Sequence, residues 1–423
     1  MTEKLSTEPY KGVRDFYPEE QAVLNHFFAT CRRVLERVGY VEYGASILEP
    51  AELYKAKGAD NEEIVNEQTY TFTDRGDRQV TLRPEMTPTV ARMVAAKRRE
   101  MGYPLRLFSL PNVFRYERPQ KGRLREHWQL NVDLFGSDSL YADAEIIGIA
   151  YGVLKAFGAK DEDFVIKVND RRNLDAVITG LGLGDREKKR LLGVLDRKNK
   201  ISGEEFSQSV LEINSEIPLD AFNNNATPPA IEQMISEFKK AGINNIEYDS
   251  SVVRGFAYYT GMVFEVFDTS GENNRSLFGG GRYDNLTRLF DANPLPGVGF
   301  GMGDVTLRDF LETHALLPAY TPPTDLYIAI SSPDLAPAAQ TFASELRTKG
   351  VNVAIDFGEK KLADQIRVAA KHRIPHLVVL GPDELATGRV RLRNLARGEE
   401  CELAREEVAG RLQSSPRPPT SSL

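Results

Sequence analysis

The sequence predicts an α+β domain, in which an antiparallel sheet is flanked by helices and interrupted by a helical insertion, followed by a C-terminal α/β domain. Three observations support this fold class. Strand patterns occur on both sides of a long polar helical stretch, short apolar runs alternate with helical patterns near the C-terminus, and a proline-containing linker separates the two textures. A length of 423 residues also predicts two or three domains rather than one core.

The composition is that of an ordinary globular protein, with 41% hydrophobic and 27% charged residues, which argues against wholesale disorder. The 54 Lys and Arg against 61 Asp and Glu give a net charge of −7. This excludes a protein that coats nucleic acid by bulk charge but allows a local basic patch. The sequence has two distant cysteines, no signal-peptide core at its start and no apolar run of ~18 residues. We therefore expect a cytoplasmic protein without a disulfide framework or a protein-bound metal.

A helix is predicted over residues 19–38, because apolar residues recur there at three- and four-residue steps. The stripe consists of Val23, Phe27, Cys31, Val34 and Val38, and Leu24, Phe28 and Leu35 widen it. A proline precedes the helix and a glycine follows it, as is common at helix ends. Such a stripe predicts either a core helix or one that is buried against a second subunit.

Residues 68–84 predict a β-hairpin, because tyrosine and phenylalanine alternate with threonines around a turn at 74–77. A helix is expected to follow, with Thr87 as its N-cap and Pro88 in its first turn. Glu85 lies between these elements. It is either an acidic residue favoured by the helix dipole or a carboxylate that binds an ammonium group.

Residues 115–125 contain five basic residues in eleven and join two predicted strands. Arginine suits phosphates because its planar fork donates two parallel hydrogen bonds, although a solvated charged turn would have the same composition. The strand 126–136 places apolar residues on one face and polar residues on the other. The polar residues are His127, Gln129, Asn131 and Asp133. Their face is either exposed to solvent or the floor of a polar pocket, and the adjacent arginine-rich loop favours the pocket.

Residues 170–242 look helical and polar and predict a helical insertion, so the first domain comprises residues 1–169 and 243–316. A strand is predicted over residues 258–267, in which the adjacent Tyr258 and Tyr259 would point to opposite faces. A glycine-rich turn is then predicted at residues 279–281, where a ligand can approach the backbone.

A linker at residues 317–324 leads to the predicted α/β domain, residues 325–413. Its predicted elements are the strands 326–330, 351–355 and 376–380 and the helices 333–348 and 360–372. Alternation of strands and helices indicates a mostly parallel sheet. Residues 414–423 are rich in proline and serine and are expected to form a disordered tail.

In their order along the chain, these segments resemble the signature segments of histidyl-tRNA synthetase, a class II aminoacyl-tRNA synthetase. The resemblance covers about residues 8–413 and is most specific in the block 115–133 and in the Arg-Gly-x-x-Tyr-Tyr segment from Arg254. Less specific matches are Lys11-Gly12-Val13-Arg14-Asp15, Thr81-Leu82-Arg83-Pro84-Glu85 and Gly280-Gly281-Arg282-Tyr283-Asp284. The resemblance implies a class II catalytic domain, an anticodon-binding C-terminal domain and a homodimer. The helix 19–38 and the Pro50 segment would lie near the dimer interface.

The resemblance also implies roles for individual residues at the ATP site. Arg115 matches an arginine that contacts the α-phosphate of ATP, and Arg254 matches a histidine-specific arginine that acts at the α-phosphate and the carboxylate. In the loop, Glu117 and Arg123 match residues that hold the adenine and the phosphates.

The residues implied to bind histidine are Glu85, Thr87, Gln129, Asp133, Tyr258 and Tyr259. The first two match residues that bind the amino group, with the glutamine beside them, and the tyrosines match a pair at the imidazole pocket. Asp133 stands where many family members use glutamate to read the imidazole. This shorter carboxylate could still do so through a shifted strand or a water.

One segment departs from the family pattern. Thr306 stands where the family commonly has an arginine that holds the γ-phosphate of ATP. Arg308 follows two positions later, which on a helix turns it roughly 200° away. A basic residue of the arginine-rich loop, Lys121 or Arg125, is the expected replacement.

The implied activity is the ligation of L-histidine to tRNA(His) through histidyl-adenylate, with ATP carrying Mg²⁺. Arg115 and Arg254 would supply the fixed cations at the α-phosphorus. Candidates for tRNA contacts in the α/β domain are Lys360, Lys361, Arg367, Lys371, His372, Arg373, Arg389, Arg391, Arg393 and Arg397. A solvated cationic surface would have the same composition, and three of these arginines alternate along one strand face.

Two other functions are compatible with the resemblance. The first is a catalytically silent paralogue that acts as the regulatory subunit of ATP phosphoribosyltransferase in histidine biosynthesis, which the departure at Thr306 favours slightly. The second is a synthetase-like module that senses uncharged tRNA. The retained arginines and tyrosines and the C-terminal domain argue for the synthetase.

Overall fold

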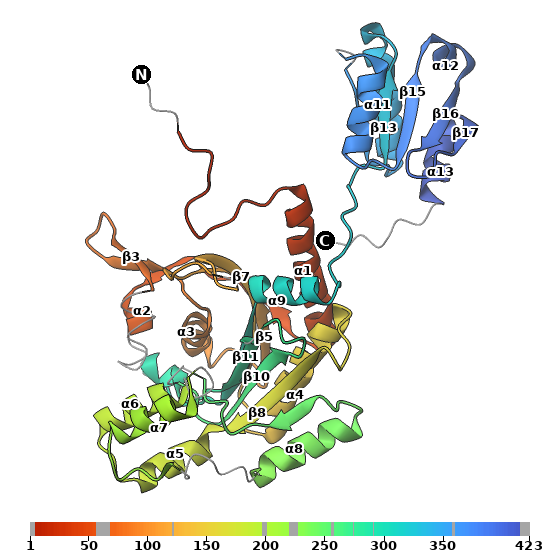
Figure 1. The fold of residues 1–423 in the computed structure, drawn as a ribbon. Helices are drawn as coiled ribbons and strands as arrows, with labels where there is room; N and C mark the ends of the chain where they lie inside the picture. The colour runs from red at the N-terminus through yellow and green to blue at the C-terminus, as the bar shows by residue number, and fades with distance from the viewer. Residues whose placement is uncertain are drawn as a thin grey trace. The chain divides into compact units, whose positions relative to one another are not determined.

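A computed structural model describes residues 5–55, 68–120, 122–196, 201–219, 227–254, 258–273, 275–290, 292–357 and 360–414. Two compact units divide the chain, Met1–Pro318 and Ala319–Leu423, and each is considered by itself (Figure 1). Of the predicted tail, residues 415–423 lie outside the described residues, as does Lys121.

The first unit is built on a large twisted sheet. Within the described residues its strand order is β1-β5-β7-β12-β11-β10-β8-β9, and β6 also pairs with β7. The strands are β1 (Val41–Glu42), β5 (Leu105–Ser109), β6 (Asn112–Phe114), β7 (Glu126–Phe135), β8 (Phe164–Asp170), β9 (Ile246–Tyr248), β10 (Met262–Asp268), β11 (Ser276–Arg282) and β12 (Gly297–Gly303). The pairs β1–β5 and β8–β9 are parallel and the others antiparallel, so the predicted antiparallel sheet is confirmed for all but its two edges.

One face of this sheet carries the main hydrophobic core. The helices that contribute to it are α1 (Pro18–Arg37), α4 (Leu140–Ala156), α8 (Pro229–Lys240) and α9 (Asp304–Thr313). The helix predicted at 19–38 is confirmed within one residue, but its most buried stripe runs through Leu24, Phe27, Cys31 and Leu35, and Val38 is exposed. All four of these residues belong to the predicted stripe, which is thus confirmed except at Val38, where the helix has already ended.

The opposite face of the sheet is covered only in part. Helix α3 (Thr87–Lys97) and the 3₁₀ turn η5 (Leu286–Phe290) contribute a smaller core there, and Figure 1 shows α3 and α4 on opposite sides of the sheet. Beside it lie a short helix, α2 (Glu52–Lys55), and a small antiparallel sheet of β2 (Leu48–Pro50), β4 (Gln79–Leu82) and β3 (Tyr70–Thr73). The predicted hairpin is thus confirmed, but Met86 rather than Thr87 is the N-cap residue of α3.

Helices follow β8 as expected. Helices α5 (Arg171–Gly180), α6 (Asp185–Asp196) and α7 (Gly203–Leu211) share a separate core with Val253, whereas α8 packs on the main sheet. The reason lies in α8 itself, because Ile231, Met234 and Phe238 form a stripe that is buried in the main core.

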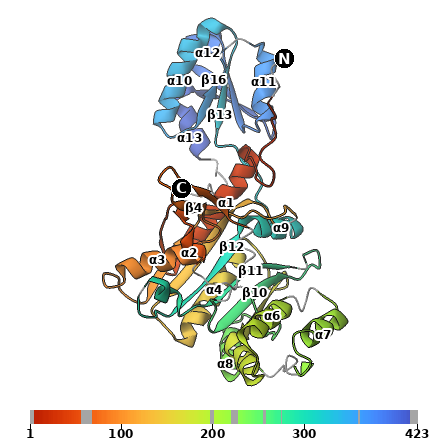
Figure 2. The ribbon, with the colours of Figure 1, turned by 90° about the vertical axis from the view of Figure 1, so that its left-hand side faces the viewer.

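The second unit is a three-layer α/β domain. Its sheet has the order β14-β13-β15-β16-β17, and Figure 2 shows α10 and α11 on opposite sides of it. The strands are β13 (Leu326–Ile330), β14 (Val353–Ile355), β15 (His376–Leu380), β16 (Arg389–Asn394) and β17 (Glu400–Ala404). The helical elements are η6 (Pro333–Leu335), α10 (Ala336–Thr348), α11 (Leu362–Lys371), α12 (Pro382–Thr387), η7 (Arg405–Glu407) and α13 (Val408–Gln413).

The expected mostly parallel sheet is wrong for half of this domain. Strand β13 pairs in parallel with β14 and β15, but β16 and β17 form antiparallel pairs. The antiparallel half was missed because a short turn, rather than a crossover helix, joins β16 to β17. In the described part of the chain, no helix has the length and hydropathy that a bilayer crossing requires.

Candidate active site

Glycines form the floor of the candidate site on the open face of the large sheet. The glycine floor consists of Gly279 and Gly281 on β11 and Gly299, Gly301 and Gly303 on β12. The two strands are in register there, with Gly279 opposite Gly301 and Gly281 opposite Gly299. Residues 279–281 were predicted as a turn, which is wrong, since all three lie within β11. Because alternate residues of a strand share a face, these glycines leave one stretch of the sheet without side chains.

Side chains from other elements lie directly on this floor. A Cβ atom at Gly279 would collide with the guanidinium of Arg254, and one at Gly301 would lie 3.1 Å from the amide of Gln129. A Cβ at Gly299 would lie 2.7 Å from Oδ1 of Asp133. The absence of side chains therefore allows three of the predicted site residues to reach the backbone of the sheet.

Arg254 is held in place from several sides. It has a left-handed backbone, with φ of 54°, which is uncommon for a residue other than glycine, and Val252 and Val253 before it are anchored in two different cores. Its Nη1 lies 3.6 Å from Oε1 of Glu265 on β10, and its guanidinium carbon lies 5.8 Å from the ring centre of Tyr259. Burial alone would lower the pKa of Arg254, but Tyr259 and Glu265 outweigh burial and raise this pKa, so the side chain is a cation.

The Nε atom of Arg254 is buried and has no hydrogen-bond partner among the described residues. A buried guanidinium with an unused donor is costly in the free protein. It is suited to a ligand that brings an anionic oxygen.

The two tyrosines connect Arg254 to the Glu85 segment. Their ring centres lie 4.7 Å apart, so the expectation that they point to opposite faces is wrong. Strand β10 begins only at Met262, and the tyrosines lie in the preceding turn, where strand alternation does not apply. The hydroxyl of Tyr258 donates to Oε2 of Glu85 at 3.5 Å and is also hydrogen-bonded to Thr87. Burial holds the pKa of Tyr258 well above its usual range, so this hydroxyl stays a donor.

Arg115 closes the site on the side of the arginine-rich loop. Its Nε donates to the carbonyl oxygen of Pro84 at 3.0 Å, which fixes it beside Glu85. Its charge also acts on His127, whose ring lies 3.6 Å from the position that a Cβ would take at Gly303. Burial, with Arg115 and Arg14 adding repulsion, lowers the pKa of His127 to about 3, so this ring is neutral.

These contacts form a continuous path from Arg115 to the glycine floor. The path runs from Arg115 through Pro84, Glu85, Tyr258, Tyr259 and Arg254 to Gly279, Gly301 and Gln129. Arg115 and Arg254 therefore lie on the same face of one sheet, although they are distant in the sequence. The polar face of β7 is the wall of this site rather than a solvent-exposed surface.

Asp133 lies at the other end of the floor with its carboxylate fully enclosed. It is 3% exposed, and its Oδ1 accepts a hydrogen bond from the hydroxyl of Tyr283. Its Oδ2 has no hydrogen-bond partner among the described residues. Burial raises the pKa of Asp133 to about 7, against the opposing effect of the Tyr283 hydroxyl. Such a carboxylate is suited to a ligand N–H group at neutral pH.

The predicted ATP residues of the loop contact each other. Nη1 of Arg123 donates to Oε2 of Glu117 at 3.1 Å, and the backbone N–H of Glu117 donates to the carbonyl of Arg115. Glu117 is largely buried, but Arg123 is exposed, so only the glutamate is fixed close to Arg115. Arg125 lies 4.1 Å from the ring centre of Tyr116 and donates to the carbonyl of Glu117.

Thr306, at the position of the missing arginine, has a structural role. Its hydroxyl donates to the carbonyl oxygen of Leu277 at 2.7 Å, which ties the first turn of α9 to β11. Nε of Arg308 donates to Oε1 of Glu312 at 3.0 Å along the same helix. Neither residue places a free cation at the site.

Several residues of the site were not singled out from the sequence. Tyr283, the partner of Asp133, lies in the quoted Gly-Arg-Tyr-Asp segment, but nothing local in the sequence pairs it with a residue on β7. The hydroxyl of Tyr54 donates to the carbonyl oxygen of Glu85 at 3.2 Å and so helps to fix the backbone of Glu85. Only their positions in the fold identify these two tyrosines.

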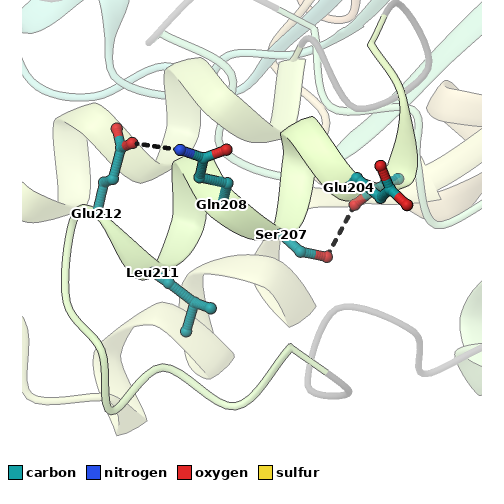
Figure 3. Close-up of a pocket in the computed structure, with 6 residues that line it drawn as sticks. Glu204, Ser207, Gln208, Leu211 and Glu212 are labelled. Carbon is teal, nitrogen blue, oxygen red and sulfur yellow. Dashed lines mark hydrogen bonds between the residues drawn. The ribbon is translucent and has the colours of Figure 1, made fainter.

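The surface also contains pockets that are unrelated to this site. One of about 700 Å³ lies along α7 and is shown in Figure 3. Its wall is a single helix whose polar groups bond to one another, with Gln208 donating to Glu212 and Ser207 to the carbonyl of Gly203. It includes none of the predicted site residues.

The site can therefore hold a small zwitterion between opposite charges. Arg115 and Arg254 can bind anionic oxygens, Glu85 can bind an ammonium group, and Asp133 can accept an N–H hydrogen bond. Within the described residues, no group of three or more His, Cys, Asp or Glu side chains is arranged to hold a metal ion. The arrangement suits electrostatic rather than nucleophilic catalysis.

Two of the three arginines on β16 in the second unit are paired with glutamates. Arg389, Arg391 and Arg393 are exposed on one face of β16, as their alternation predicted. Strand β17 places two glutamates against them, since Arg389 lies 2.6 Å from Glu402 and Arg393 lies 3.5 Å from Glu400. These arginines were tRNA candidates, but this face is a salt-bridged ladder rather than an unpaired cationic surface.

Comparisons with known proteins give family matches for both units of the chain. A family model described as histidyl-tRNA synthetase matches residues 12–305, and one described as anticodon binding domain matches residues 325–415. The histidine–tRNA ligase of Leptospira biflexa is 42% identical over 417 residues, covering 93% of this chain and 94% of that protein.

Two solved structures share the fold. The histidyl-tRNA synthetase of Nostoc superposes with a TM-score of 0.79 at 24% identity and covers 97% of this chain and all of that one. A protein from Bacillus halodurans, described as an ATP phosphoribosyltransferase regulatory subunit/histidyl-tRNA synthetase, gives a TM-score of 0.67 at 23% identity, covering 90% and 98%. At these identities both show the fold alone.

Proposed function

The chain belongs to the histidyl-tRNA synthetase family, and we propose that it ligates L-histidine to tRNA(His) with the site described above. The observation that carries this proposal is the continuous path of contacts that joins Arg115 to Arg254 beside the glycine floor. It gives two cations, an ammonium-binding carboxylate and a second, buried carboxylate within one site.

In the first step, a carboxylate oxygen of histidine attacks the α-phosphorus of ATP. The new P–O bond gives histidyl-adenylate, and the bond from the α-phosphorus to the bridging oxygen breaks, so that pyrophosphate leaves with the electron pair. Two anions must approach each other, and negative charge grows on the phosphorus oxygens. Arg115 and Arg254 lower this barrier because they are fixed cations in a partly dry site. Mg²⁺ enters with ATP, bound to its phosphates, as part of the substrate.

Asp133 selects the side chain of the amino acid. Its unpartnered Oδ2 accepts the N–H of the imidazole, and Glu85 binds the ammonium group with Thr87 and Gln129 beside it. An amino acid without a ring N–H leaves a buried carboxyl group unpaired, which is costly and disfavours that amino acid.

In the second step, a hydroxyl of the terminal ribose of tRNA attacks the carbonyl carbon of the adenylate, and AMP leaves. The C-terminal domain, residues 325–413, binds the anticodon region, a role supported by its match to an anticodon-binding family. Because glutamates of β17 pair with Arg389 and Arg393 of β16, the contacts to tRNA fall mainly to the basic residues at 360–373. The helical insertion belongs to the catalytic part of the chain, and the enzyme works as a cytoplasmic homodimer.

The direct test is histidine-dependent exchange of pyrophosphate into ATP, followed by charging of tRNA(His) with radiolabelled histidine. We expect exchange with histidine and none with other amino acids at similar concentration. Charging without histidine-dependent exchange would contradict the two-step reaction. Exchange with no charging would contradict the ligase assignment.

The same assay tests the regulatory-subunit function, which the Thr306 departure favours slightly. A regulatory subunit would bind histidine without exchange. The 42% identity to a histidine–tRNA ligase over nearly the whole chain supports the enzyme instead.

A further inference from the structure

The start of α9 has a threonine where the resemblance implies an arginine for the terminal phosphates of ATP. Thr306 occupies that position with its hydroxyl bound to the carbonyl oxygen of Leu277. The tip of the arginine-rich loop lies beside it, because a Cβ at Gly122 would be 3.6 Å from the Thr306 methyl group. The loop, the first turn of α9 and the start of β11 therefore meet at one place.

Arg275 also lies at this meeting point. It directly precedes β11, two residues before the Leu277 carbonyl that binds Thr306. Its Nη2 donates to Oε1 of Gln120 in the arginine-rich loop at 3.3 Å, so the guanidinium reaches the same loop. Two independent contacts thus connect this segment to the loop and to the first turn of α9.

Four of the described cations near this end already have partners. These pairs are Arg14 with Asp304 at 2.7 Å, Arg123 with Glu117 at 3.1 Å and Arg308 with Glu312 at 3.0 Å. Arg125 is stacked on Tyr116. Arg275 differs from the three paired arginines, because no carboxylate among the described residues pairs with it and its hydrogen-bond partner is a neutral amide.

We propose that Arg275 binds the γ-phosphate of ATP and the leaving pyrophosphate, in place of the arginine that Thr306 replaces. This inference rests on the proposed function and deepens it. An exposed guanidinium with a long, mobile side chain and a weak neutral partner can turn to a phosphate at little cost, and its planar fork suits two phosphate oxygens. Arg275 also enters the site from the start of β11 rather than from α9.

The test compares the affinities of the full chain for ATP and for AMP, which lacks the β- and γ-phosphates, by titration calorimetry with Mg²⁺ present. Arg275→Ala is expected to weaken ATP binding about tenfold or more and to leave AMP binding unchanged, because one charge-assisted contact is lost. Arg275→Lys should keep most of the ATP affinity. Arg308→Ala, the matched control on α9, should bind both nucleotides like the wild type.

The proposal is overturned if Arg275→Ala binds ATP as tightly as the wild type, or if its affinities for ATP and AMP fall equally. An equal fall would indicate general damage to the site. Because the measurement needs no catalysis, its failure can be distinguished from a failure of the ligase activity. If the wild-type chain binds ATP but shows no histidine-dependent exchange, the ligase function is contradicted. The comparison of ATP and AMP affinities would still decide the role of Arg275.

Discussion

Replacement of Asp133 by asparagine should change the pH dependence of stability in a specific direction. The carboxyl group is buried, and its pKa rises from 3.8 to about 7 on folding. A raised pKa stabilises the folded chain below 3.8, and this contribution is lost as the pH rises towards 7, because the unfolded chain ionises first. The asparagine side chain has nearly the same shape and no ionisation, and its amide oxygen can still accept the Tyr283 hydroxyl.

The size of the effect follows from the two pKa values. A pKa of 7 against 3.8 lowers the free energy of unfolding by about 4 kcal/mol when both states are ionised. Between pH 5 and pH 8 the same two pKa values lower the free energy of unfolding by about 2.5 kcal/mol. The rest of the loss occurs below pH 5. The wild type should therefore lose about this much stability relative to Asp133→Asn over that interval.

The single tryptophan, Trp128, lies on β7 with Asp133 and reports the unfolding of this unit alone. Urea unfolding followed by its fluorescence at pH 5 and pH 8 gives the difference in free energy at each pH. Asp138→Asn, which removes an exposed carboxylate just beyond β7, controls for the loss of one negative charge. A stability difference between wild type and Asp133→Asn that stays constant with pH would refute the reasoning.

Further predictions concern activity. Arg254→Ala should lower histidine-dependent pyrophosphate exchange by about 100-fold or more while the Trp128 fluorescence stays native, because a fixed cation at the α-phosphorus is lost; normal exchange would exclude its role. The KM for histidine should fall as the pH rises through about 7, since ionised Asp133 accepts the imidazole N–H, and a flat profile between pH 6 and pH 8 would contradict this assignment. Gly301→Ala should raise the KM for histidine several-fold, because the new methyl group would crowd Gln129. Gly303→Ala serves as the control, since its surroundings are less crowded, and equal KM values for the two variants would contradict a role of the glycine floor in histidine binding. Removal of residues 325–423 should reduce tRNA charging far more than exchange, and an equal loss of both would indicate a role in folding.

Local sequence patterns predicted much of the fold. Strand alternation identified the polar face of β7, and helical spacing located α1 within one residue. Such patterns show which face a residue shares, because the period belongs to the element itself. They do not show what lies opposite that face.

The features that the sequence did not reveal depend on contacts between distant segments. Tyr283 meets Asp133 across 150 positions, and the ladder of Glu400 and Glu402 against the β16 arginines depends on strand register. The neighbouring rings of Tyr258 and Tyr259 were misjudged because their segment turns before β10 begins. Register and turn geometry are set by the whole sheet, so they become visible only in three dimensions.

The bare stretch of β11 and β12 has a consequence for evolution. Since no side chain rises from this surface, its contour is that of the main chain and hardly depends on which amino acid the pocket accepts. Selectivity resides instead in groups that overhang it from separate parts of the chain, such as Asp133 and Tyr258. Exchange of an overhanging group can thus redirect the pocket towards another amino acid while the supporting strands remain unaltered.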